Sequence, residues 1–330
     1  MKRELYVFNN GDIRRKDNTI LFETENEKKY VPVEEINNIW IFGEVTINKS
    51  LLDFLSQKEI CLHFFNYYGY YSGSYYPREH LNSGFVILKQ AEHYLDLSKR
   101  MVIAKEITMT AAKNIIVILK YYNSRGVELE EKIESITRKL KKMEEINTIE
   151  QLMALEGNIR DEYYECFNYI LKNNDFKFTV RSKRSPLDNI NSLISFGNSL
   201  LYTTILGEIY QTQLDPRIGY LHSTNERRFT LNLDIAEIFK PIIVDRTIFT
   251  LINRGVITHK DFEKSFNGIL ITENGRKKFI QEYTNKLDAV IKHPHLNVNV
   301  SYKRLIRLEL YKIQKHITEN SEYKGFVAGW

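Results

Sequence analysis

Hydrophobic and polar positions along the chain change their period near residue 77. Before that point, short apolar runs alternate with turn residues, a pattern typical of β-strands. It predicts strands at 5–8, 13–15, 19–22, 29–33, 38–42, 45–47 and 61–65, with one short helix at 50–55. The tyrosine-rich run 66–76 predicts an edge strand, and a contact between subunits is the alternative interpretation.

After the polar segment 77–84, apolar positions recur three or four residues apart. This spacing is typical of helices with one apolar face. It predicts helices within 103–122, 129–143, 151–173, 187–213, 233–254, 272–292 and 301–317. Gly197 and Asn198 are expected to interrupt the fourth of these, and Pro241 to kink or break the fifth. Residues 258–270 are expected to form a short connection, and 323–330 a flexible or docked tail.

The change of period predicts an α+β fold in two parts. A small N-terminal β-rich domain is expected at 1–77, a linker at 78–90 and a larger all-α domain at 91–330. For a chain of 330 residues, length alone predicts two domains or one large one.

Composition narrows the class of protein. Hydrophobic residues make up 43% of the chain, enough for a core, and the net charge of +5 permits contact with nucleic acid without establishing it. The only two cysteines, Cys61 and Cys166, form neither a zinc ribbon nor a disulfide framework, which favours a reduced, cytoplasmic protein. The N-terminus lacks the apolar core of a signal peptide, and no apolar run reaches the ~18 residues that cross a bilayer. We therefore expect no membrane partner.

One stretch, 217–240, concentrates the residues that carry chemistry. His222 precedes two carboxylates, Asp234 and Glu237, which share a helix face if 233–239 is helical. Divalent cations accept carboxylates with an imidazole, and oxygen-rich mixtures of these ligands suit Mg²⁺ or Mn²⁺ better than Zn²⁺. The spacing alone leaves a second interpretation open, in which the histidine is structural and the carboxylates lie on the surface.

Basic residues gather in two places. The segment 177–186 carries Lys177, Arg181, Lys183 and Arg184, and it is either a phosphate clamp or a solvated loop. Arg227 and Arg228 lie between the histidine and the two carboxylates. The charged face of 129–143 is interpreted as solvated, with a DNA-facing surface as the alternative.

Four segments, taken together, resemble the CRISPR-associated integrase family, Cas1. They are Leu155-Glu156-Gly157 with Arg160, the run 184–198, the run 215–222 and the run 233–255. Their order and spacing resemble the family over nearly the whole chain, as does the β-then-helical layout. The ending 326–330 is similar to the type I-B subgroup.

The resemblance implies a metal-binding, catalytic triad of Glu156, His222 and Glu237, with Mg²⁺ or Mn²⁺ as cofactor. His222 would then be a ligand rather than a general base. Many members of the family have aspartate where this chain has Glu237, whose arm is one methylene longer. Asp234 falls on a nearby acidic position that supports the site.

The resemblance also implies the reaction and the partners. The family inserts double-stranded protospacer DNA into the CRISPR repeat array, by attack of a 3′-hydroxyl on a phosphodiester, and cleaves branched DNA. It forms homodimers, here through the β-rich domain, and a small ferredoxin-like protein bridges two dimers. Our candidates for contacts with the DNA backbone are Arg181, Lys183, Arg184, Arg227 and Arg228. The alternative functions are a structure-selective repair nuclease and a non-catalytic DNA-binding scaffold.

Overall fold

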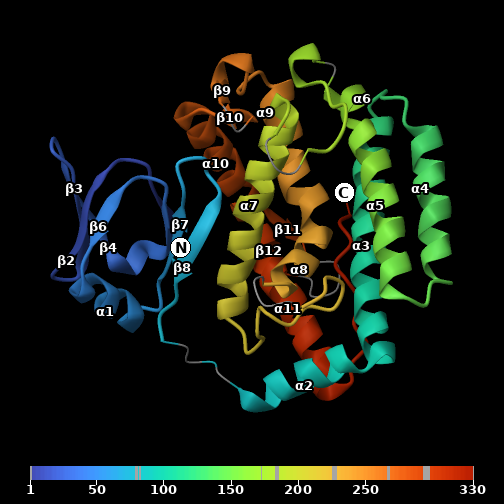
Figure 1. Cartoon of the computed structure of the whole chain (residues 1–330), viewed down its shortest axis with the longest axis horizontal. Helices are drawn as coiled ribbons and strands as arrows, with labels where there is room; N and C mark the ends of the chain where they lie inside the picture. The colour runs from blue at the N-terminus through green and yellow to red at the C-terminus, as the bar shows by residue number, and fades with distance from the viewer. Residues whose placement is uncertain are drawn as a thin grey trace. The chain divides into compact units, whose positions relative to one another are not determined.

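The computed structural model (Figure 1) describes residues 2–78, 81, 83–171, 173–182, 186–224, 229–265, 268–292 and 298–329. The chain forms two compact units, 1–82 and 83–330. The first is rich in strands and the second is mainly helical, so the predicted α+β fold is confirmed.

The N-terminal unit contains two four-stranded sheets. One has the order β1-β5-β7-β8 and the other β4-β3-β2-β6. In the first sheet β1, β5 and β7 run parallel and β8 is antiparallel, so the tyrosine-rich segment supplies an edge strand as predicted. The elements are β1 (Arg3–Val7), β2 (Gly11–Lys16), β3 (Thr19–Glu23), β4 (Lys28–Pro32), β5 (Ile36–Ile41), β6 (Val45–Ile47), α1 (Lys49–Gln57), β7 (Cys61–Phe65) and β8 (Tyr71–Tyr75).

Apolar side chains from both sheets and α1 form the core of this unit. Ile13, Ile39, Leu51 and Leu62 are at most 2% exposed and belong to one cluster. The side chain of Asn48 accepts a hydrogen bond from the Leu51 backbone at 2.9 Å and so caps the helix that contributes Leu51.

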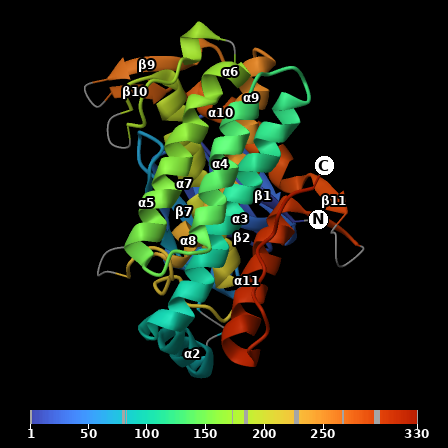
Figure 2. The same cartoon turned by 90° about the vertical axis from the view of Figure 1, so that its right-hand side faces the viewer.

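Eight longer helices and several short elements form the C-terminal unit within the described residues (Figure 2). The longer helices are α2 (Gly84–Leu95), α3 (Leu97–Asn123), α4 (Glu130–Met143), α5 (Ile149–Glu165), α7 (Asn189–Tyr210), α8 (Leu231–Phe239), α10 (Glu273–Asp288) and α11 (Tyr302–Glu319). The short ones are α6 (Phe167–Leu171), α9 (Arg246–Asn253), β9 (Phe262–Ser265), β10 (Gly268–Ile271), β11 (Val290–Lys292) and β12 (Asn299–Ser301).

Helix α7 runs without a break through Gly197, so the predicted interruption is wrong. A Cβ built at Gly197 would lie 2.6 Å from Val244 Cγ1 and 2.8 Å from Phe279 Cζ. The glycine therefore allows neighbouring elements to approach the helix closely, and burial of the helix offsets its low helix propensity.

Pro241 disturbs the helix that follows α8, as predicted. Residues Lys240–Asp245 form a π-helical turn between α8 and α9. Proline has no N–H to donate to the carbonyl four residues earlier, which here belongs to Glu237. The backbone is therefore irregular immediately after a candidate site residue.

Three other expectations need correction. Helix α2 begins at Gly84, inside the predicted linker 78–90, because the Ser83 side chain caps it. The expected connection 258–270 contains the antiparallel pair β9–β10. The expected helix 272–292 ends at Asp288 and continues as β11, which pairs with β12. Two short sheets thus accompany the helices.

Residues after α11 dock rather than project into solvent. Tyr323, Phe326 and Ala328 are each at most 4% exposed. Of the two states expected for this tail, the structure shows the docked one. None of the helices in the described ranges has the length and apolar character that crossing a membrane requires.

Replacing Gly197 with alanine is expected to lower the free energy of unfolding. Alanine favours the helix by about 1 kcal/mol, but overpacking against Val244 and Phe279 costs about 1–3 kcal/mol. Gly157→Ala in α5 is the matched control, because its Cβ would meet nothing within 4 Å. Thermal unfolding should show a lower Tm for Gly197→Ala only, and equal Tm values in both variants would contradict this packing.

Candidate functional site

The candidate site is built on three segments of the C-terminal unit. Glu156 comes from α5, Glu237 from α8, and His222 from the loop between α7 and α8. The charge of Glu237 shifts the pKa of both other groups, and the charge of His222 shifts that of both carboxylates. The structure thus brings together three residues that the sequence separates by up to 81 positions.

The loop that carries His222 is held by two side chains from α2 and α3. The Gln90 amide nitrogen donates to the carbonyl oxygens of Asp215 and Ile218, both at 2.9 Å, and its oxygen accepts from the Asp215 N–H at 2.8 Å. Arg100 Nε donates to the Tyr220 carbonyl oxygen at 2.7 Å. Gln90 is fully buried, so these hydrogen bonds are shielded from water.

Asp234 organises the same loop from the other side. Its carboxylate accepts backbone N–H hydrogen bonds from Tyr220 at 2.5 Å, Leu221 at 2.9 Å and His222 at 2.9 Å. A Cβ at Gly219 would lie 2.8 Å from Asp234 Oδ2, so only glycine permits this approach. Asp234 is fully buried and therefore supports the loop instead of facing solvent.

Asp234 also fixes the imidazole. His222 Nδ1 lies 2.8 Å from Asp234 Oδ1, and the His222 side chain is 29% exposed. This hydrogen bond engages one ring nitrogen and leaves Nε2 for another partner. Burial lowers the pKa of His222, but the hydrogen bond and charge of Asp234 outweigh burial and raise the pKa above 6.5.

Glu237 is held between two cations. Its Oε2 accepts from Arg160 Nη2 at 2.5 Å, and its Oε1 accepts from Lys240 Nζ at 2.5 Å. All three residues are at most 8% exposed. Burial alone would raise the pKa of Glu237, but the charges of Lys240 and Arg160 lower it to about 2. Glu237 is therefore ionised, and its charge is compensated locally.

The negative charge of Glu156 is compensated less than that of Glu237. Arg160 Nε lies 3.4 Å from Glu156 Oε1, and Arg160 already pairs with Glu237. Burial and the charge of Glu237 raise the pKa of Glu156 above its ordinary value. The cluster consequently holds one carboxylate whose negative charge would be stabilised by a further cation.

The three residues do not form a preassembled metal centre. In the part of the chain that the structure describes, no group of three or more His, Cys, Asp or Glu side chains is arranged to hold a metal ion. Both Glu237 oxygens are engaged by Arg160 and Lys240 instead. A cation could be ligated there once Glu237 turned away from at least one of these two side chains.

Sequence reasoning did not assign Lys240 or Asp245 to the site. Lys240 is three residues after Glu237, a spacing that places both on one helix face and could have indicated the pair. The Lys240 ammonium also lies 5.1 Å from the centroid of the Tyr202 ring of α7. Asp245 is fully buried near Arg160, and burial raises its pKa to about 7. Nothing in the local sequence indicates that contact.

Of the basic residues expected to contact DNA, only Arg181 lies within the described ranges. Its guanidinium donates to Asn191 Oδ1 at 2.8 Å and to Ser195 Oγ at 3.0 Å, so it ties the loop after α6 to α7. Lys183, Arg184, Arg227 and Arg228 lie outside the described residues.

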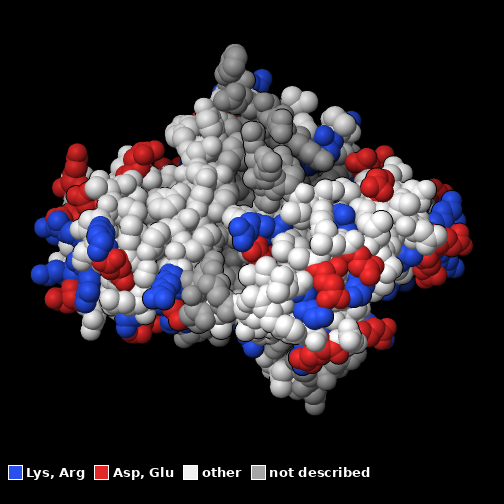
Figure 3. Space-filling model, turned by 60° about the horizontal axis from the view of Figure 1, so that its bottom comes forward, with Lys and Arg blue, Asp and Glu red and all other residues white. Residues whose placement is uncertain are grey.

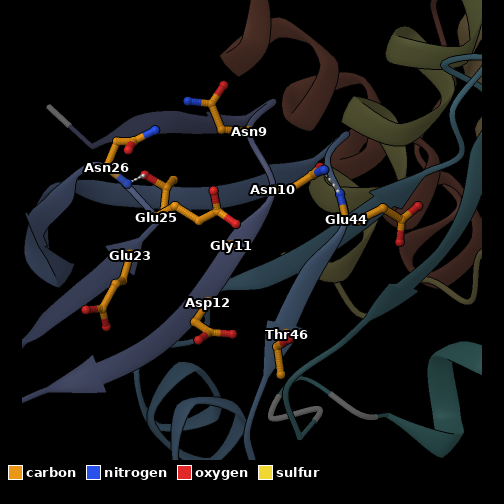
Figure 4. Close-up of a pocket in the computed structure, with 10 residues that line it drawn as sticks. Asn9, Asn10, Gly11, Asp12, Glu23, Glu25, Asn26, Glu44 and Thr46 are labelled. Carbon is orange, nitrogen blue, oxygen red and sulfur yellow. Dashed lines mark hydrogen bonds between the residues drawn. The ribbon is translucent and has the colours of Figure 1, made fainter.

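A separate hollow lies in the N-terminal unit (Figure 4) and has a volume of about 710 Å³. Asp12, Glu23, Glu25 and Glu44 are among its lining residues. Figure 4 shows these side chains on neighbouring strands and the loops that join them. A lining with four carboxylates repels phosphate, so this hollow does not suit a DNA backbone.

Comparison with known proteins agrees with this architecture. Residues 5–285 match the family model described as CRISPR associated protein Cas1, and the chain belongs to that family. It is 56% identical to CRISPR-associated endonuclease Cas1 2 of Thermodesulfovibrio yellowstonii, with 100% of both chains covered. It is 49% identical to CRISPR-associated endonuclease Cas1 of Thermotoga maritima, over 95% of this chain and 96% of that protein.

Two solved structures share the fold. A Cas1 protein from Thermotoga maritima superposes with a TM-score of 0.88 and 46% identity, covering 99% of this chain and 100% of that one. A casposase bound to its integration product superposes with a TM-score of 0.87, covering 98% and 93%. The casposase is only 20% identical, so that likeness concerns the fold alone. The resemblance to Cas1 inferred from the four sequence segments is thereby confirmed.

The raised pKa of His222 has a direct test. Because the folded pKa exceeds 6.5, proton binding to His222 stabilises the fold fully below about pH 6.5, and this contribution is lost as pH rises through the folded pKa. In an NMR titration, Asp234→Asn should lower the midpoint of His222. His93, whose pKa burial lowers, should titrate identically in both proteins. An unchanged His222 midpoint would contradict the assigned role of Asp234.

Removing the buried Arg160 guanidinium should lower the free energy of unfolding much more than removing an exposed guanidinium. Arg160→Gln leaves Glu237 with one cation fewer and should lower the free energy of unfolding by about 3 kcal/mol. The control is Arg138→Gln, whose pair with Glu134 spans 3.8 Å at exposed side chains and should contribute less than ~0.5 kcal/mol. Urea unfolding measures both, and comparable losses would show that Glu237 does not depend on Arg160.

Proposed function

We propose that this protein is a metal-dependent DNA endonuclease and integrase of CRISPR adaptation, which inserts protospacer DNA into the repeat array. The observation that carries the proposal is the convergence of Glu156, His222 and Glu237 in one charged, largely buried cluster. Membership of the Cas1 family supports it, because relatives that cover the whole chain are named CRISPR-associated endonucleases.

The residues of the cluster fit a divalent cation. Two carboxylates and an imidazole form a donor set that Mg²⁺ or Mn²⁺ accepts. The hydrogen bond from His222 Nδ1 to Asp234 leaves Nε2 as the ligand atom, an arrangement common around metal-bound histidines. Burial of Glu156 beside Glu237 provides a place where an added positive charge is favourable. Glu156, His222 and Glu237 would hold the ion.

When bound, such an ion polarises a phosphodiester and stabilises the leaving 3′ oxygen. The chain itself supplies positioning. Asp234 holds the His222 ring, while Arg160 and Lys240 place two positive charges beside Glu237, where a DNA phosphate would be attracted. As Glu237 turned towards the ion, these two side chains would become available to the phosphate oxygens.

The proposed strand transfer balances without a protein intermediate. The 3′-hydroxyl oxygen of the protospacer attacks phosphorus in the repeat and loses its proton. A new phosphodiester forms as the bond from phosphorus to the repeat's own 3′ oxygen breaks, and that oxygen takes up a proton from solvent, which balances the proton that the attacking hydroxyl releases. Water in place of the hydroxyl gives hydrolysis, so nuclease activity on branched DNA would accompany integration.

Contacts with the DNA backbone are assigned to Arg181, Lys183, Arg184, Arg227 and Arg228. The hydrogen bonds from Arg181 to Asn191 and Ser195 would hold its guanidinium in one orientation. On the face shown in Figure 3, Lys and Arg are interspersed with Asp and Glu among the described residues, without a continuous basic surface. Phosphate binding would therefore depend on local groups such as the loop that carries Arg181.

The proposed assembly is a homodimer formed through the β-rich N-terminal unit, with a small ferredoxin-like protein bridging two dimers. A chain of the same fold, 18% identical and with a TM-score of 0.85, forms part of a structure titled Cas6-RT-Cas1–Cas2 complex. A similar chain, 13% identical and with a TM-score of 0.59, appears in a structure titled as a TtCas1–DNA complex. The proposed location is the cytoplasm.

Substitution of each proposed ligand should abolish turnover while the protein stays folded. Glu156→Ala, His222→Ala and Glu237→Ala are expected to lose joining and cleavage of branched DNA in Mg²⁺ or Mn²⁺, measured by gel with a labelled 3′-hydroxyl donor. Glu134→Ala, an exposed glutamate of α4, is the matched control and should retain both activities.

The products separate the competing functions. Cleavage without joined product would identify a nuclease that acts without integration. DNA binding with no metal-dependent turnover in the unsubstituted protein would identify a non-catalytic scaffold. Full activity in any one of the three alanine variants would remove that residue from the site.

A further inference from the structure

The C-terminal strap, residues 321–329, packs along helices of the C-terminal unit. Tyr323, Phe326 and Ala328 alternate with more exposed neighbours and are each at most 4% exposed. Figures 1 and 2 both show this red segment beside α3. The strap is therefore part of the folded core rather than a free end.

One buried side chain joins the strap to the helix that carries Glu237. The Asn114 amide nitrogen donates to the carbonyl oxygens of Ile238 and Phe326, both at 3.0 Å. Its oxygen accepts from the Ala328 N–H at 2.9 Å. Asn114 is fully buried, so loss of the strap would leave part of this amide without hydrogen bonds in an apolar region.

Asn114 contacts α8 where the regular helical hydrogen bonding is interrupted. Pro241 cannot donate to the Glu237 carbonyl, and the π-helical turn begins at Lys240. Asn114 holds the carbonyl of residue 238 at this point, and the Phe326 ring stacks on Phe239 with a centroid separation of 6.4 Å and an interplanar angle of 8°. The strap thus supports the two residues that separate Glu237 from Lys240.

Further polar contacts fix the strap to α11 and to α3. The Tyr323 hydroxyl donates to Glu309 Oε1 at 2.7 Å, and Lys312 Nζ donates to the Lys324 carbonyl oxygen at 2.9 Å. The Gly325 N–H donates to Glu106 Oε1 at 2.8 Å. At Gly325 the backbone passes so close to α3 that a Cβ would lie 2.2 Å from Thr110 Oγ1.

We propose that the C-terminal strap is a positioning element for Glu237 and Lys240, acting through Asn114 and Phe239. Displacing the strap loosens the end of α8 and moves the carboxylate relative to Glu156 and His222. The strap residues are positioning residues, because none of them lies among the groups proposed to contact DNA or metal. The expected effect on the rate of DNA cleavage rests on the proposed function. The expected effect on the structure of α8 does not.

Two glycines in the strap provide a matched pair of variants. Gly325→Ala drives a methyl group into Thr110 and should lift the strap, whereas Gly329→Ala places it where nothing lies within 4 Å. Hydrogen exchange followed by mass spectrometry should show faster exchange in 321–329 and in α8 for Gly325→Ala only. In cleavage of branched DNA, its kcat should fall by about ten- to a hundred-fold, with a smaller change in KM for DNA, since a ~1 Å misplacement of catalytic groups can cost about a hundred-fold.

Rescue distinguishes a specific contact from general damage. Adding Thr110→Gly to Gly325→Ala removes all three clashing atoms, Oγ1, Cβ and Cγ2, and should restore both kcat and slow exchange in α8 to the values of Thr110→Gly alone. Phe326→Ala, which removes the ring against Phe239, provides a second variant if Gly325→Ala does not fold, with the same expected changes.

The proposal is overturned if exchange rises in 321–329 while exchange in α8 and kcat remain at their unsubstituted values. Absence of cleavage by the unsubstituted protein would instead count against the proposed function. Exchange in α8 would then still decide whether the strap holds that helix.

Discussion

The buried ion cluster around Glu237 is the constraint on which the rest of the site depends. A carboxylate that is 6% exposed remains ionised only with local compensation, and Arg160 and Lys240 supply it from α5 and from the end of α8. The same pairing fixes where α5 must lie relative to α8. Glu156, on the same helix as Arg160, is thereby brought to Glu237, and the geometry of the site follows from satisfying one buried charge.

Helix packing explains why the remaining components converge on this cluster. Asp234, one turn before Glu237, binds the loop of His222 through three backbone N–H groups, and Gln90 and Arg100 hold that loop from α2 and α3. Asn114, also on α3, reaches the carbonyl of Ile238. These contacts are buried or partly buried between segments distant in the chain, so they are formed only when the helices are assembled. The site is consequently a product of the tertiary fold rather than of any single segment.

Sequence periodicity predicted most elements, because strands and helices each place apolar side chains at a fixed spacing. It failed where a local preference was overridden by packing, as at Gly197, which stays helical beneath Val244 and Phe279. The spacing within 217–240 indicated His222 with Asp234 and Glu237, whereas Glu156 could be selected only through the resemblance to a family, since its distance from them along the chain carries no signal. The pairing of Arg160 with Glu237 spans 77 positions, and no local pattern indicates it.

The central claim is that Glu156, His222 and Glu237 hold one divalent cation once Glu237 turns away from Arg160 or Lys240. The most direct measurement is anomalous X-ray diffraction at the manganese edge from crystals grown with Mn²⁺. The account predicts a single peak bonded to His222 Nε2 and to oxygens of both glutamates, with Glu237 turned away from at least one of its two cations. Crystals in which Mn²⁺ is absent from this cluster, and in which Glu237 keeps both ion pairs, would contradict it.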